Sequence, residues 1–161
     1  MKQLILVRHA KSSWDLPVQD FDRPLSNRGI QNAHLVSSKV VKYLPETFVI
    51  WSSAAKRAME TAIIFTQNFL CPIESIIFKK ELYTFDLHKL ENSIKSCSDQ
   101  FDNLILFGHN EAITNFVNKF GNINIDNVST SGFVSITFQT NSWQNISKGE
   151  TTRVVFPKDL E

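Results

Sequence analysis

The chain has 161 residues, of which 42% are hydrophobic, and a formal net charge of +1. This length suits one globular domain spanning residues 1–161, and the near-neutral charge argues against nucleic acid or a membrane surface as the partner. The N-terminal apolar run is far too short for a signal peptide or a membrane span, and Cys71 and Cys97 lack metal-site or redox spacing, so we expect a cytoplasmic protein with packed thiols.

The first part of the chain alternates between strand-like and helix-like patterns. Apolar runs at residues 4–7 and 48–51 predict buried strands. A helix is expected to begin at Ser26, whose hydroxyl can cap the first turn, and to keep apolar residues at helical spacing as far as Pro45. A second helix should run from about Ala55 to Phe69, so that strands and helices succeed one another.

In the second part of the chain, the alternation of strands and helices gives way to β-rich runs near the C-terminus. The expected elements are a strand at 76–78, a helix near Asp86 to Cys97, a strand at 104–107, a helix at 112–120, and β-rich runs at 133–138 and 153–156. The last two runs suggest a hairpin at a sheet edge. The whole pattern predicts an α/β fold, a three-layer αβα sandwich around a mostly parallel mixed sheet.

Two histidines each follow one of the apolar runs. His9 comes directly after Arg8, and His109 comes directly after the run at 104–107 and a glycine. Loops that leave the carboxyl ends of neighbouring parallel strands converge on one crevice, so these residues are expected to share a pocket. The run at 48–51 leads to Arg57 by the same geometry. Two imidazoles and two arginines are the groups that phosphoryl chemistry needs.

The four residues have distinct expected roles. His9 can attack phosphorus through a neutral ring nitrogen if its other nitrogen donates to a backbone carbonyl. Arg8 and Arg57 would clamp the phosphoryl oxygens, and Ser52-Ser53 could cap the helix that carries Arg57. The plainer alternatives are a core histidine at 109 and a solvated helix residue at 57. Their joint placement at strand ends favours a functional site.

Other phosphate and metal chemistries find no support in the sequence. No cysteine precedes an arginine at phosphatase-loop spacing, and no Walker-type glycine loop is present. Asp20-Phe21-Asp22 resembles a metal-dependent aspartate motif, but it does not follow a buried strand, so a solvated loop is expected. His34 and His88 show no paired helical spacing with a carboxylate. We expect no metal.

The segment from Leu6 to Trp14 resembles the signature of the histidine phosphatase superfamily, in the form typical of small phosphohistidine phosphatases of the SixA type. Further matches in the family's order and spacing cover most of the chain, at residues 20–29 with Ala33, 52–62 and 108–110. The resemblance implies a phosphoglycerate mutase-like fold for a single histidine phosphatase domain, 1–161, without a cofactor. It implies His9 as the nucleophile and Arg8, Arg57 and His109 as the rest of the phosphate pocket.

Three further residues are expected around that pocket. Ser12 occupies a place in the signature that matches a phosphate-side serine of mutase-like relatives, which implies contact with the phosphate. Arg23 and Lys11 are expected at the rim, where they would attract acidic substrates, although a solvated role for Lys11 is equally compatible with the sequence. Ser12 and Arg23 are therefore the expected substrate-binding residues.

The chain departs from mutase-like members, which usually carry a glutamate general acid shortly after the third strand. The comparable stretch offers only Glu81 and Asp86, and each is expected to be a surface carboxylate. A leaving imidazole needs such an acid less than an alkoxide does, because its reference pKa is about 6.5 and solvent can protonate it. The short chain also leaves little length for a cap over the pocket. Both points favour phosphohistidine displayed on another protein.

The sequence thus predicts a metal-independent, monomeric phosphatase that forms a phosphohistidine at His9 and hydrolyses it with water. Its expected partner is a protein that carries phosphohistidine. Two alternatives stay open: a phosphatase or mutase that acts on small phosphorylated metabolites, and a binding module that keeps the anion pocket without turnover.

Overall fold

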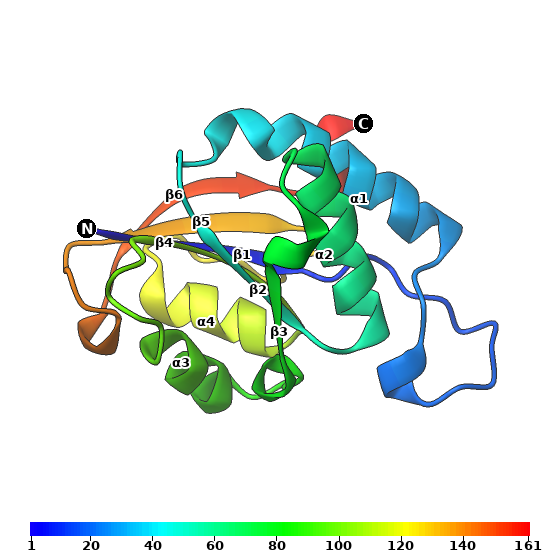
Figure 1. The fold of residues 1–161 in the computed structure, drawn as a ribbon, viewed down its shortest axis with the longest axis horizontal. Coiled ribbons are helices and arrows are strands. Elements are labelled where there is room, and N and C mark those ends of the chain that lie inside the picture. Colours follow the sequence, from blue (N-terminus) through cyan, green and yellow to red (C-terminus); the bar gives the residue numbers. More distant parts are fainter.

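The computed structural model describes residues 1–161, and Figure 1 shows a central sheet with helices on both faces. Six strands lie in the order β3-β2-β4-β1-β5-β6. Their bounds are β1 Lys2–Arg8, β2 Val49–Ser53, β3 Ile76–Lys79, β4 Asn103–Gly108, β5 Phe133–Phe138 and β6 Glu150–Val155. The first four strands are parallel, whereas β5 pairs antiparallel with β1 and β6 pairs antiparallel with β5. The predicted mixed sheet with a late hairpin at its edge is confirmed.

Four helices cover the sheet. They are α1 Asn27–Val40, α2 Lys56–Asn68, α3 Leu87–Lys95 and α4 Ala112–Phe120. In β1, Ile5 and Val7 pack in the core formed with α1 and α2, and Leu4 and Leu6 pack in the core formed with α3 and α4. Side chains of a strand alternate between the two faces, so a strand covered on both faces has to be apolar throughout. This is the predicted three-layer sandwich.

The end of α1 and the cap of α2 differ from the sequence prediction. Ser26 caps α1 as expected, since its Oγ accepts the Gly29 N–H at 3.0 Å, but the α-helix ends at Val40. The next residues form a 3-10 turn, and Leu44 is extended because it precedes a proline. The prediction of a serine cap for α2 is wrong. The N-cap residue is Ala55 without a side-chain hydrogen bond, because Ser52 and Ser53 complete β2.

The long segment after β1 is fastened at its base. Ser12 pairs with Leu25 in an isolated antiparallel bridge, and the Ser26 N–H donates to the Lys11 carbonyl at 2.9 Å. Gly29 of α1 makes this closeness possible, because a Cβ there would lie 2.1 Å from the Lys11 carbonyl oxygen. Beyond the base, residues 14–22 extend away from the sheet (Figure 1). We call residues 14–22 the projecting loop.

The two strands that precede the histidines are in register. Gln3 of β1 pairs with Asn103 of β4, and the pairing continues to Arg8 and Gly108. At the opposite end of β1 the buried Lys2 ammonium donates to the backbone carbonyls of Asp99 and Phe101 and to the Asp102 carboxylate. The strands are therefore fixed relative to one another at both ends.

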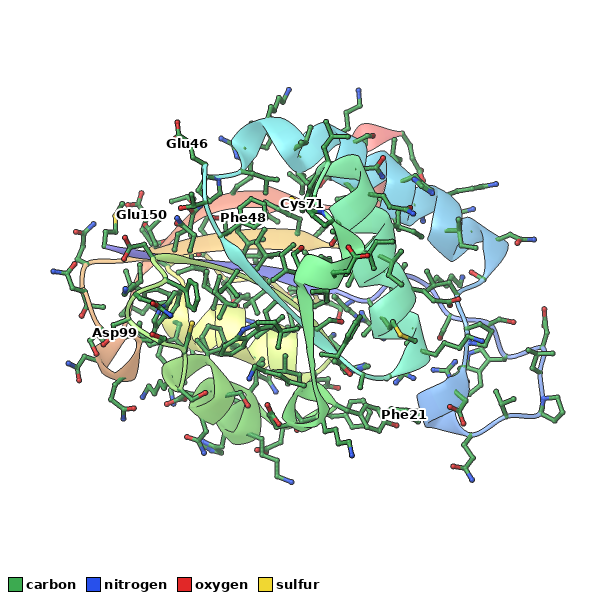
Figure 2. All side chains as sticks on the ribbon, in the orientation of Figure 1. Phe21, Glu46, Phe48, Cys71, Asp99 and Glu150 are labelled. Carbon is green, nitrogen blue, oxygen red and sulfur yellow. The ribbon has the colours of Figure 1, made fainter.

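Both cysteines are free thiols. Cys97 is buried in the core, and Cys71, which Figure 2 labels, is partly buried. The helices include none with the length and apolar character needed to cross a membrane.

Candidate active site

His9 lies directly after β1 and is 8% exposed. Its Nδ1 lies 2.7 Å from the Ala10 carbonyl oxygen and donates to it, which leaves Nε2 without a proton. The Arg57 Nε–H points at this Nε2 at 3.4 Å. Burial, together with the positive charges of Arg57 and Arg8, lowers the pKa of His9 to about 4. His9 is thus a neutral imidazole at neutral pH with a free lone pair on Nε2, in the tautomer that nucleophilic attack requires.

His109 lies directly after β4, and its ring centroid is 5.3 Å from that of His9. Its Nε2 lies 2.8 Å from Ser53 Oγ, which also accepts the Ala55 N–H at 3.2 Å. A serine hydroxyl can donate one proton while it accepts from the backbone, so Ser53 can donate to Nε2 in the tautomer that carries the imidazole proton on Nδ1. Burial and the nearby His9 and Arg57 lower the pKa of His109 well below its ordinary value. Nδ1 has no hydrogen-bond partner in the protein.

Arg57 is in the first turn of α2 and is 2% exposed. Its Nη1 donates to the Asp20 carbonyl at 2.7 Å, and its Nη2 donates to the Asp20 carboxylate at 3.0 Å. Arg8 donates from Nη1 to the Val128 carbonyl at 2.9 Å, and burial lowers the pKa of its guanidinium. The structure therefore brings together the four residues that strand-end geometry singled out, His9, His109, Arg57 and Arg8.

A cavity of about 620 Å³ opens beside His9 at the carboxyl ends of the parallel strands. It is lined by Arg8, His9, Lys11, Ser12, Trp14, Asp20, Arg23, Arg57, Tyr83, Phe85, Asn110 and Thr130. Ser12, Arg23 and Lys11 are in this lining, as the sequence predicted, whereas His109 is buried beneath it. Four cationic side chains and one carboxylate give the cavity a net positive charge that suits a phosphoryl group.

Asp20 and Tyr83 are site residues that sequence reasoning missed. Asp20 was expected in a solvated loop, but its carboxylate accepts from Arg57, from Arg23 at 3.3 Å and from the Tyr83 hydroxyl. Partial burial raises the pKa of Asp20, but the hydrogen bonds from Tyr83 and Arg57 outweigh this and lower it to about 2. Burial and the bond to Asp20 raise the pKa of Tyr83. The available signal was Arg57 itself, because a buried arginine needs a carboxylate partner.

The two carboxylates considered as general acids lie elsewhere. Glu81 forms an exposed ion pair with Lys79, and the Asp86 carboxylate caps α3 by accepting the Lys89 N–H at 3.0 Å. Neither residue lines the cavity, so both are surface carboxylates as expected. His, Cys, Asp and Glu side chains do not form any group of three that could hold a metal ion.

Three buried nitrogens of the site lack a hydrogen-bond partner within the protein. They are Arg8 Nε, Arg23 Nη1 and His109 Nδ1, which make up half of the buried unpartnered side-chain atoms in the structure. A buried donor without an acceptor costs free energy, so such atoms at one site indicate a ligand that accepts hydrogen bonds. The oxygens of a phosphoryl group meet this requirement.

Comparison with known proteins assigns the family. Residues 4–104 match the model of the histidine phosphatase superfamily (branch 1). The chain belongs to this superfamily. It is 37% identical over 93 residues to a 2,3-bisphosphoglycerate-dependent phosphoglycerate mutase from Gloeothece citriformis, across 55% of the chain and 40% of the mutase. An uncharacterised chloroplastic protein of Arabidopsis thaliana is 46% identical over 63 residues, across 37% of the chain and 28% of that protein. The chain thus matches less than half the length of these two relatives.

Solved structures of small superfamily members share the whole fold. The protein histidine phosphatase SixA complexed with tungstate superposes with a TM-score of 0.83 at 18% identity and covers 99% of both chains. A putative phosphohistidine phosphatase SixA from Agrobacterium tumefaciens gives 0.76 at 21% identity, with 96% of this chain and 97% of that chain covered. The predicted phosphoglycerate mutase-like α/β fold of the superfamily is confirmed.

Proposed function

We propose that this chain forms a single domain, residues 1–161, that acts as a metal-independent phosphatase and removes phosphate from protein phosphohistidine through a phospho-His9 intermediate. The observation that carries the proposal is the state of His9. Its imidazole is neutral, its Nδ1 proton is held by the Ala10 carbonyl, and its Nε2 lone pair lies next to Arg57 in a cationic cavity. Membership of a superfamily of phosphatases and mutases supports catalysis rather than binding alone.

In the first step, the Nε2 lone pair of His9 forms a bond to phosphorus while the P–N bond of the substrate breaks. The departing imidazole keeps the bonding electron pair and takes a proton from water. Arg8 and Arg57 would bind the phosphoryl oxygens as charge spreads over them, and the Nδ1–H of His109 would donate to one of those oxygens. The Ala10 carbonyl stabilises the positive charge that develops on the His9 ring.

In the second step, a water molecule attacks phosphorus and the P–N bond to His9 breaks. The electron pair of that bond returns to Nε2, the water oxygen stays on the phosphate, and its proton leaves with the phosphate or with solvent. His9 is then neutral again. The low pKa of His9 helps here, because it makes this imidazole a good leaving group.

The carboxylate chemistry of the cavity supports phosphohistidine as the substrate. Asp20 is the one carboxylic residue in the lining, and with a pKa of about 2 it is ionised at neutral pH. It therefore has no proton to give to a leaving group. An alkoxide would need that proton, whereas an imidazole is protonated by solvent near neutral pH.

A phosphatase or mutase that acts on small phosphorylated metabolites is the second candidate, and the likeness to a phosphoglycerate mutase favours it. The two candidates are separated by kcat/KM for phosphohistidine against kcat/KM for phosphorylated sugars and phosphoglycerates. A mutase would transfer the phosphoryl group to a second metabolite instead of releasing inorganic phosphate. A binding module without turnover would hold a phosphohistidine peptide tightly and leave p-nitrophenyl phosphate intact.

The covalent intermediate is the direct test. After a brief reaction with a ³²P-labelled phosphohistidine protein and a denaturing quench, the native chain should retain label that is stable to base and labile to acid. His9→Ala should retain none, while His34→Ala, which alters an exposed histidine of α1, should label like the native protein. Equal labelling of the His9→Ala variant would refute the mechanism.

A further inference from the structure

The projecting loop places apolar side chains in solvent at the mouth of the cavity. Every residue from 14 to 22 is exposed, and Trp14 and Leu16 have exposed fractions of 78% and 54%. Val18 and Phe21 are exposed on the same loop, and Phe85, 52% exposed, adds a further ring from the segment after β3. Grouped exposed apolar side chains next to a binding site mark an interaction surface, because their exposure to water costs free energy in the unbound protein.

This loop is held in place by contacts with the catalytic site. The Trp14 ring stacks on the Arg23 guanidinium at 3.5 Å, and the Asp20 carboxylate binds Arg57. Phe21 lies on the side of the loop that faces the segment after β3, where it packs edge-on against Tyr83 at 5.1 Å (Figure 2). A surface that is already ordered loses little conformational entropy when a partner binds.

The exposed apolar residues begin in the cavity lining and extend along the projecting loop beyond it. Trp14 and Phe85 are in the cavity lining together with His9, whereas Leu16 and Val18 are outside that lining. A phosphoryl group bound at His9 would therefore bring the molecule that carries it against Trp14 and Phe85. A small hydrophilic metabolite would end within the cavity. Only a larger carrier would cover Leu16 and Val18.

We propose that Trp14, Leu16, Val18, Phe21 and Phe85 form a docking surface for the phosphorylated protein, and that this protein presents apolar side chains beside its phosphohistidine. The inference rests on the proposed function and specifies how the protein substrate is recognised. The charges agree with this arrangement, since cationic groups line the cavity that receives the phosphoryl group and exposed apolar side chains lie beside it. Recognition would then come from the carrier's surface as well as from the phosphoryl group.

Two phosphohistidine peptides of equal length and charge test the proposal, one with leucine and the other with serine on both sides of the phosphohistidine. The native protein should hydrolyse the leucine peptide with a kcat/KM about tenfold higher, which corresponds to ~1.4 kcal/mol of transition-state binding. The double variant Leu16→Ser/Val18→Ser should lose this preference. The matched double variant Leu70→Ser/Ile73→Ser, which alters exposed apolar residues before β3 at the far end of that strand, should keep it. Hydrolysis of p-nitrophenyl phosphate by each variant reports whether the catalytic site is intact.

The possible results are distinct. Equal kcat/KM on the two peptides, or a preference that survives Leu16→Ser/Val18→Ser, would overturn the docking surface and leave the phosphohistidine phosphatase intact. Hydrolysis of p-nitrophenyl phosphate without hydrolysis of any phosphohistidine would end the proposed function, and the docking inference with it. Self-association in sedimentation velocity that the Leu16→Ser/Val18→Ser variant abolishes would show that a second copy of this chain covers the surface, which would also overturn the proposal.

Discussion

The floor and the mouth of the cavity are built on different principles. On the floor, His9 and His109 are buried at the ends of β1 and β4, and the Ala10 carbonyl and Ser53 fix their ring nitrogens. At the mouth, the projecting loop is exposed along its whole length and contributes apolar side chains. The difference places the proposed catalytic groups on strand ends and the proposed recognition on a loop, so we expect mutations of one to spare the other.

Arg57→Lys alters the cavity floor and is expected to cause the largest loss of activity. A lysine cannot present the planar fork that binds two oxygens and also contacts His9 Nε2, so kcat/KM for p-nitrophenyl phosphate should fall roughly 10²-fold to 10³-fold. Arg28→Lys, at an exposed arginine of α1 outside the cavity, is the matched control and should keep native kinetics. Near-native activity of Arg57→Lys would mean that Arg57 is not part of the phosphate clamp.

Asp20→Asn removes the charge of the carboxylate that links Arg57, on the cavity floor, to the projecting loop at its mouth. The amide keeps the shape of the carboxylate but loses the charge that holds Arg57 and Arg23, so we expect kcat/KM to fall about tenfold as the guanidinium loses its orientation. Tyr83→Phe removes one hydrogen bond to Asp20 and should cost roughly fivefold or less. Asp22→Asn changes a neighbouring exposed carboxylate outside the cavity lining. An equal decrease of kcat/KM in Asp22→Asn would show that the effect comes from the negative charge of the loop in general and not from the contact between Asp20 and Arg57.

The pH dependence of His9 protonation tests the description of the cavity floor without changing the amino-acid sequence. Because the folded pKa of His9 is about 4, its Nε2 should stay unprotonated from pH 7 down to about pH 5 and gain a proton as the pH falls through about 4. An NMR titration of the His9 imidazole, assigned by its absence in His9→Ala, measures this directly. The unfolded chain takes up the same proton near pH 6.5, so the free energy of unfolding should decrease as the pH falls from about 6.5 towards 4. A His9 midpoint near 6.5 would contradict a buried neutral nucleophile.

Sequence patterns predicted the histidines of the cavity floor because these residues follow buried strands. His9 and His109 each follow an apolar run after one intervening residue, and the topology of a parallel sheet then brings them together. Asp20 and Tyr83 could not be found in this way. Both lie outside strands and helices that have a periodic signature. Asp20 is on the projecting loop and Tyr83 follows β3, and only the tertiary fold brings them to Arg57 and to each other.

Local rules also failed where tertiary contacts compete for the same group. Ser53 was expected to cap α2, but its hydroxyl contacts His109 Nε2 and accepts the Ala55 N–H instead. The end of α1 at Val40 has a local cause instead: residues 41–43 form a 3-10 turn, and Leu44 is extended ahead of Pro45, which apolar spacing alone does not show. The sequence therefore predicts both helices, but it misassigns the cap of α2 and the end of α1.

The matched register of β1 and β4 makes the separation of the two imidazoles a property of the sheet. Loss or gain of one residue in either strand would move one histidine along it by about 3.3 Å and turn its side chain to the opposite face. Evolution therefore has little freedom to change the length of these strands, which Lys2 also secures from the far end. The projecting loop has no such constraint between its base and Asp20. Insertions there could give descendants of this protein new partners while the chemistry stays the same.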